Sequence, residues 1–171
     1  MADSVSDTLT ATVRTVLLWN RTNALEVGAI TSTKTAVQDY QIADGADAGE
    51  ADMVFTDTRT IPAGTFETFD LSDLTQQTLG VVDVPYQFAQ IRLFRVRNLS
   101  TTAGERLLVG ASPGAPLSVY AADVGPASEW FAINYQDAWQ VTADNAEFSI
   151  SNPNATDVSY ELYIIGTAEA A

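Results

Sequence analysis

The chain has 171 residues, of which 46% are hydrophobic, and its 22 acids and 8 bases give a formal net charge of -14. It contains no Cys and no His, which excludes disulfides, thiolate or histidine catalysis and nearly all zinc and copper sites. The acidic balance disfavours phosphate backbones and anionic membranes, and no apolar run is long enough to span a bilayer. We therefore expect a non-enzymatic single domain with no nucleic-acid or membrane partner and no catalytic, cofactor-binding or metal-binding residues.

Short apolar stretches with a period of two, separated by turn residues, dominate the first half of the chain. Phe66 and Phe69 lie three residues apart, a spacing that suits a bend over 65–71 better than a strand. The segment 71–78 is the best candidate for a helix, although it is short. The strands expected in this half span residues 10–20, 36–42 and 51–60.

The segment 86–98 is the strongest strand candidate. Ile91 and Leu93 point to one side of it, and Phe94 and Val96 point to the other. Apolar residues on both faces indicate a central strand that is covered on both sides.

The same region reverses the sign of the charge, because four arginines stand there against Glu105: Arg92, Arg95, Arg97 and Arg106. We expect the first three to lie near the strand ends or to extend outward. Two interpretations remain open. The arginines form ion pairs with acids of this chain, or they make a basic stripe that meets an acidic neighbour.

The second half continues the strand pattern, and its last two strands are expected to form a hairpin around the turn 152–155. The expected strands span residues 105–110, 117–120, 129–133, 139–143, 147–151 and 158–166. Their number and spacing predict an all-β protein, a jelly-roll-like antiparallel β-sandwich in one domain over 8–167. Residues 1–7 and 168–171 are expected to be flexible tails.

The acidic loop 44–52 is a candidate calcium site, because calcium prefers clustered carboxylates on a glycine-rich turn. Its spacing does not match the EF-hand pattern. A solvated surface loop is the favoured interpretation.

Four aromatic residues cluster in the sequence: Trp130, Phe131, Tyr135 and Trp139. They are candidates for a sugar-stacking platform on a receptor-binding surface. Packing in the core or between subunits is favoured, because Trp130 and Phe131 alternate with the apolar Ile133 along a strand.

In order along the chain, several strand-and-turn motifs resemble those of small β-rich structural proteins encoded by phages and prophages. They begin at Asp7 with Asp-Thr-Leu-Thr-Ala-Thr, at Ala43 with Ala-Asp-Gly-Ala, at Glu50 with Glu-Ala-Asp-Met-Val-Phe-Thr-Asp-Thr-Arg-Thr, at Asp70 with Asp-Leu-Ser-Asp-Leu-Thr, at Arg97 with Arg-Asn-Leu-Ser-Thr-Thr-Ala, at Leu107 with Leu-Leu-Val-Gly, and at Tyr160 with Tyr-Glu-Leu-Tyr-Ile-Ile-Gly.

This resemblance implies a virion protein, made in the cytoplasm of a bacterial host, that sits on the capsid exterior as a trimer. The expected function is that of a decoration or cement protein that binds the major capsid protein and stabilises the head. The alternative is a head fibre, a spike or a tail receptor-binding module that recognises a host surface glycan through the aromatic cluster.

Overall fold

The computed structural model describes residues 9–25, 28–78, 82–110 and 122–168, which form strands and turns. None of these residues belongs to a helix that could cross a membrane. In chain order the strands are β1 (Ala11–Leu25), β2 (Gly28–Asp44), β3 (Glu50–Ala51), β4 (Met53–Ile61), β5 (Phe66–Asp70), β6 (Leu74–Thr78), β7 (Val82–Tyr86), β8 (Phe88–Asn98), β9 (Leu107–Val109), β10 (Ala122–Val124), β11 (Glu129–Ile133), β12 (Trp139–Gln140), β13 (Glu147–Ser151) and β14 (Val158–Ala168).

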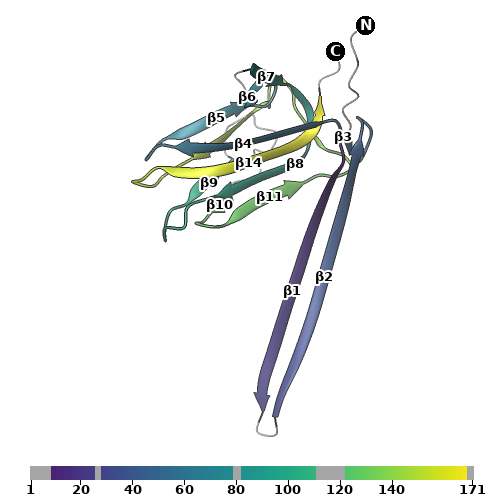
Figure 1. Cartoon of the computed structure of the whole chain (residues 1–171), viewed down its shortest axis with the longest axis vertical. Helices are drawn as coiled ribbons and strands as arrows, with labels where there is room; N and C mark the ends of the chain where they lie inside the picture. Colours follow the sequence, from purple (N-terminus) through teal and green to yellow (C-terminus); the bar gives the residue numbers. More distant parts are fainter. Residues whose placement is uncertain (1–8, 26–27, 79–81, 111–121, 169–171) are drawn as a thin grey trace.

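Two antiparallel sheets pack face to face and form the body of the molecule (Figure 1). A four-stranded sheet has the order β10-β9-β13-β5, and a five-stranded sheet has the order β11-β8-β14-β4, with β12 also paired to β8. The ring of Phe94 in one sheet meets the ring of Phe148 in the other edge-on, with centroids 4.5 Å apart. The predicted all-β fold in a single domain is therefore confirmed, while the jelly-roll strand order stays a prediction.

The central strand of the five-stranded sheet is β8, which lies between β11 and β14 as the sequence predicted. Phe94 and Val96 are fully buried between the two sheets. Leu93 is 6% exposed on the opposite face, beneath the first residues of β1. β8 is thus covered on both faces, by the second sheet and by the base of β1. The expectation that Ile91 shares a side with Leu93 is wrong, because Ile91 packs in the core with Phe94 and the pairing with β14 shifts register between Ile165 and Gly166.

A long ribbon made of β1 and β2, which we call the arm, extends away from this body (Figure 1). Its strands pair antiparallel in one unbroken register, from Ala11 opposite Ile42 to Leu25 opposite Gly28. Val16 and Val37, which pair across the ribbon, are 57% and 48% exposed and still line a hollow with Phe131 of β11, so the arm begins to leave the body at this level. Nine further residues of β1 follow, a reach of about 30 Å.

Two predictions in the segment 65–78 are wrong. The expected bend is the strand β5, which pairs with β13 along all five of its residues. Phe69 stacks on Phe148 with centroids 4.7 Å apart, whereas Phe66 is 69% exposed on the outer face. A spacing of three places two side chains on opposite faces of a strand. The expected helix is also a strand, because β6 pairs with β7.

The predicted terminal hairpin is wrong as well, because β13 and β14 belong to different sheets. The side-chain amide of Asn152 is buried and donates to the backbone carbonyls of Ile61 and Thr156 at 2.9 and 2.8 Å. It thereby anchors the connection that carries the chain across the sandwich. The inward alternation predicted for the last strand is confirmed, since the three residues expected to face inward are fully buried: Tyr160, Leu162 and Ile164.

The remaining predicted strands are confirmed in place, with changes of length. β1 and β2 are much longer than expected, and β9 and β12 are shorter. The strand predicted at 117–120 and the tails predicted at 1–7 and 169–171 lie outside the described residues, whereas Ala168 ends β14.

Candidate interaction surface at the base of the arm

Arg92 lies in the middle of β8 with 1% of its surface exposed, so the expectation that it extends outward is wrong. Its guanidinium donates to the backbone carbonyls of Glu50, Asp47 (2.7 Å), Gln136 (3.1 Å) and Tyr135 (3.2 Å). Among the described residues it forms no ion pair with a carboxylate. This buried cation therefore joins two loops, 45–49 at the end of the arm and 134–138 after β11.

Tyr135, which lies in the loop 134–138, contacts the base of the arm directly. Its hydroxyl donates to the carbonyl of Gln41 at 2.6 Å, and its ring lies 5.6 Å from the ring of Tyr40. A Cβ added at Gly49 would lie only 3.1 Å from the Tyr135 ring, and Gly49 has φ of +82°. Arg92, Tyr135 and the loop 45–49 together form what we call the clasp, which sets the direction of the arm.

The acidic loop has a structural role in this clasp. The Glu50 carboxylate accepts a hydrogen bond from the Asp47 backbone N–H at 3.1 Å and packs against Gly45. The carbonyls of Asp47 and Glu50 bind Arg92. Over the described residues no group of three or more acids is placed to hold a metal ion. The geometry thus favours an arginine-organised loop over the calcium site considered from the sequence.

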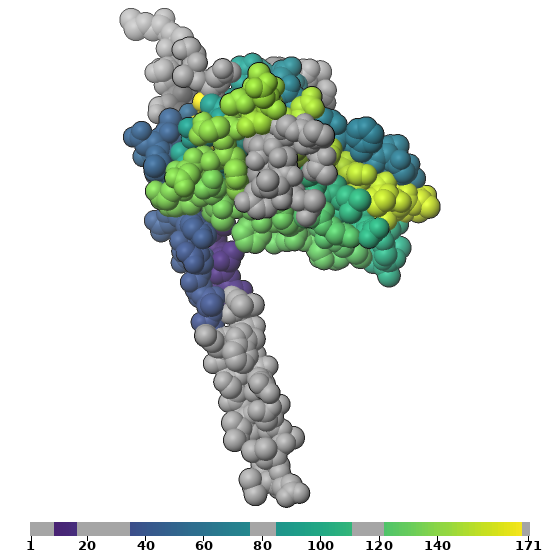
Figure 2. Space-filling view, turned by 180° about the vertical axis from the view of Figure 1, so that it is seen from behind, coloured from purple at the N-terminus to yellow at the C-terminus, as the bar shows by residue number. Residues whose placement is uncertain are grey.

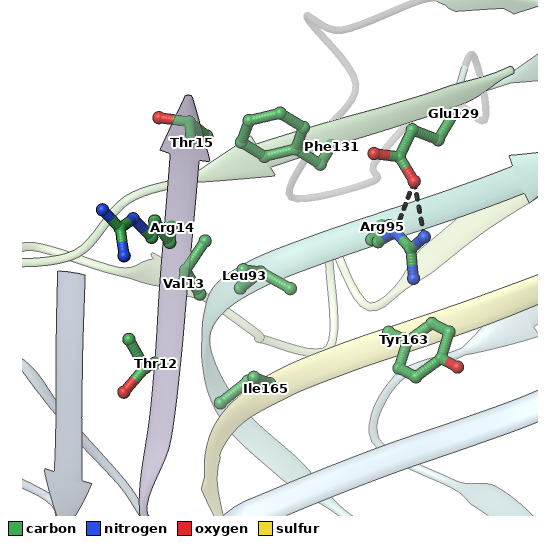
Figure 3. Close-up of a pocket in the computed structure, with 10 residues that line it drawn as sticks. All are labelled: Thr12, Val13, Arg14, Thr15, Leu93, Arg95, Glu129, Phe131, Tyr163 and Ile165. Carbon is green, nitrogen blue, oxygen red and sulfur yellow. Dashed lines mark hydrogen bonds and ion pairs between the residues drawn. The ribbon is translucent and has the colours of Figure 1, made fainter. Parts of the chain in front are cut away.

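A groove runs between the arm and the outer face of the five-stranded sheet, and we call it the root groove (Figure 3). Val13 of β1 faces Leu93 and Ile165 on the sheet, and the hollow they line has a volume of about 290 Å³. A second hollow of about 340 Å³ adjoins it at Thr15 and Phe131. Three of the exposed large apolar side chains of the described chain gather here: Val16, Val37 and Phe131.

The other arginines pair with acids of this chain, as one of the two interpretations predicted. Arg95 donates to Glu129 at 2.8 Å, and its guanidinium lies over the Tyr163 ring (Figure 3). Arg97 lies 3.4 Å from Glu161, and Arg106 lies 2.9 Å from Asp123. These three pairs are partly or largely exposed and contribute little stability. The first two pairs, which lie on β8, β11 and β14, leave the outer face of the five-stranded sheet close to electrically neutral.

The four residues of the aromatic cluster do not share one surface. Trp130 and Trp139 are half-buried and pack against the core, and Trp130 lies 5.8 Å from the Phe94 ring. Tyr135 belongs to the clasp, and Phe131 faces the root groove. This arrangement favours packing, the second of the two interpretations, over a sugar-stacking platform.

No protein-family model matches the chain, and no curated protein has a matching sequence.

Proposed function

We propose that this chain is a phage virion structural protein that decorates the outer surface of the capsid and stabilises the head by binding the major capsid protein. The observation that carries the proposal is the arm. It is a ribbon of two strands of 15 and 17 residues that leaves a well-packed sandwich and is held at its base by a buried arginine.

The arm has the properties of an element that is completed by another protein. Among the described strands, β1 pairs only with β2, and β2 otherwise pairs only with two residues of β3. A two-stranded ribbon is marginally stable alone in water, and its unpaired edges are sites where further strands add. An arm of this kind suits a protein that reinforces a shell by lying across its neighbours.

The charge supports a location on the outside of the particle. The net charge of -14 repels packaged nucleic acid and helps to keep a decorated particle soluble. The resemblance of the ordered strand-and-turn motifs to small phage structural proteins supports the same assignment. Permanent assemblies of this class bury roughly 2,000 Å² or more, and a trimer on the capsid surface would multiply the contacts that each arm makes.

The test is the copy number of the chain in purified particles, measured by quantitative mass spectrometry against the major capsid protein. We expect a fixed ratio to the capsid subunits, because a protein that decorates a symmetric shell repeats with its lattice. A variant in which residues 17–36 are replaced by Asn-Gly should be lost from the particles. A ratio of only a few chains per particle would contradict the proposal.

A further inference from the structure

We propose that three copies of this chain assemble through their arms, which close into one six-stranded antiparallel β-barrel. The inference deepens the proposed function, because it says which segment forms the trimer and how. Its test uses the purified chain without a shell, so the two proposals can fail separately. A trimer that does not bind capsids would refute the proposed function alone, and a monomer that binds capsids would refute this inference alone.

Both edges of the arm are open strand edges. Among the described strands, β1 pairs with β2 alone, and the outer side of β2 pairs only at its last two residues, with Glu50 and Ala51 of β3. About half of the backbone N–H and C=O groups of each strand therefore point away from the ribbon. Unpaired edges of this length are templates on which another strand adds.

A further copy of the arm supplies the strand that each edge requires. The two strands of the ribbon run in opposite directions. When several ribbons stand around one axis and point the same way, β2 of each copy lies beside β1 of the next. These two strands are antiparallel, so the new seam has the hydrogen-bond pattern of the seam inside the ribbon. A closed ring of copies leaves no edge unpaired, whereas a different protein added at one edge leaves the other edge open.

The position and charge of the arm permit this contact. The arm emerges from one side of the body (Figures 1 and 2), so several bodies can stand around a central bundle of arms. Residues 11–44 contain three bases and three acids, hence a net charge of zero. Residues 45–171 contain five bases and 17 acids, hence a net charge of -12. Arms can therefore meet without net repulsion between them, although the chain as a whole is strongly acidic.

One face of the ribbon is suited to the inside of a barrel. It begins at Val16 and Val37, which pair across the ribbon and are 57% and 48% exposed. Residues two apart along a strand share a face, and the register is unbroken to the end of the ribbon. The positions that share this face hold Val16, Leu18, Asn20, Thr22 and Ala24 on β1 and Ala29, Thr31, Thr33, Thr35 and Val37 on β2. None of these ten residues is charged.

The charges of the same stretch stand at the alternate positions. The strands contain two charged residues between Val16 and Val37, which are Arg21 and Lys34. Both belong to the set of positions that alternates with the uncharged face. An enclosed interior cannot take an unpaired charge without a large cost. The uncharged face is therefore the one that a barrel can enclose, and the charged face stays outside, where it is free to meet a shell.

The size of the residues on the uncharged face selects the number of copies. Eight of the ten are alanine, threonine or valine. The diameter of a barrel increases with its strand number, and eight strands already give an interior that ordinary side chains fill. Six strands enclose a narrower interior, which small side chains suit. Two ribbons would give only four strands, and four ribbons would give an eight-stranded interior that these residues leave partly empty. Three ribbons are therefore expected.

The test is the mass of the purified full chain, measured by light scattering after size exclusion and by sedimentation over a range of concentrations. The wild type should be a trimer. Val16→Asp with Val37→Asp should raise the concentration of half-dissociation by about a hundredfold or more, because each copy would bring unpaired carboxylates into the interior. Phe66→Asp with Leu108→Asp is the matched control. It changes two exposed apolar residues of the other sheet and should leave the trimer intact.

The decisive comparison uses neighbouring residues of the arm. Thr33→Asp should dissociate the trimer, because position 33 shares the face of Val37, whereas Ser32→Asp should not, because position 32 belongs to the outer face. Neither change touches the sandwich, so both variants should keep its melting temperature. In the trimer, amides of both arm strands should exchange slowly at every position, and in Thr33→Asp every second amide should exchange quickly.

Three outcomes would each overturn the proposal. The first is a wild type that stays monomeric at about 100 µM or that forms an oligomer of another size. The second is equal behaviour of Thr33→Asp and Ser32→Asp. The third is a wild-type trimer in which every second arm amide still exchanges quickly, since the seams between copies would then be absent.

Discussion

Replacing Arg92 with Met should cost this protein a large part of its stability. The substitution removes four hydrogen bonds from a charged donor to backbone carbonyls in a site that is 1% exposed. Each such bond contributes about 1.5–3 kcal/mol, or roughly 6–12 kcal/mol together. Methionine also removes the penalty of burying a guanidinium, which is several kcal/mol. The net loss should be about 3–5 kcal/mol, the range found when one partner of a buried charged interaction is removed.

For a domain of 171 residues, each kcal/mol lowers the melting temperature by about 2–4 °C. Thermal denaturation followed by circular dichroism should therefore show a decrease of about 10 °C or more for Arg92→Met. Arg92→Lys should lie between this variant and the wild type, because an ammonium keeps the charge but cannot present the planar fork that reaches two loops. Amide exchange should increase most in 43–51 and 134–138, the segments that the guanidinium joins.

The matched control is Arg97→Met on the same strand. Arg97 is exposed and lies 3.4 Å from Glu161, so its loss should change stability by less than about 0.5 kcal/mol. If Arg92→Met stayed within 1 kcal/mol of the wild type, or if exchange rose uniformly over the sandwich, the clasp would not be what holds the arm.

Three smaller tests address single features of the sandwich. Hydrogen bonds from the hydroxyls of Ser100 and Thr156 hold the pKa of the Glu105 carboxyl below its ordinary value of 4.5. The stability that the ionised carboxylate adds is therefore present above that pH and is lost as the pH falls through the lower folded pKa. The melting-temperature gap between wild type and Glu105→Gln should thus narrow as the pH is lowered below the ordinary value, and a gap that stayed constant would contradict this assignment. Asn152→Ala leaves buried carbonyls without a donor and should cost about 2–3 kcal/mol by denaturant titration. Gly166→Ala places a Cβ 2.0 Å from a carbonyl oxygen of β8 and should cost more than about 3 kcal/mol, whereas Gly125→Ala, with its nearest neighbour at 3.9 Å, should be nearly neutral.

The strands that the sequence predicted well are those whose alternation is imposed by the core. β11 and β13 begin and end where they were expected, and β14 buries every second residue from Val158 to Ile164. β5 was missed because its two phenylalanines serve different surfaces, one the core and one the outside. The alternation that identifies a strand therefore did not appear in its apolar residues.

The arm shows a different limit. Strands were expected at 10–20 and 36–42, and the structure extends them to Leu25 and back to Gly28. The polar run 31–35 has no alternation of apolar residues, so it gave no periodic signal. The hairpin error has a third cause. The turn residues around Asn152 are those of a tight turn, and local chemistry does not distinguish a turn within one sheet from a turn between two sheets.

The buried arginine could not be found from local sequence, because Arg92 owes its burial to loops 42 to 45 residues away along the chain. The signal present was indirect: an arginine between Ile91 and Leu93 in the most apolar strand has no easy path to solvent. Of the two interpretations that the sequence left open for the neighbouring arginines, pairing within the chain agrees with the structure.

Burying an arginine to join two loops costs several kcal/mol of desolvation. The geometry of the arm explains why an apolar contact would hold its base less well. The arm reaches about 30 Å beyond the body, so a tilt of about 10° at its base displaces its far end by roughly 5 Å, more than one residue along a strand. An apolar contact at the base would tolerate such tilts, because it is non-directional. The planar fork of Arg92, which binds carbonyls from both loops at once, does not tolerate them. A directional clasp of this kind is needed only if the far part of the arm must arrive at a fixed position on another molecule.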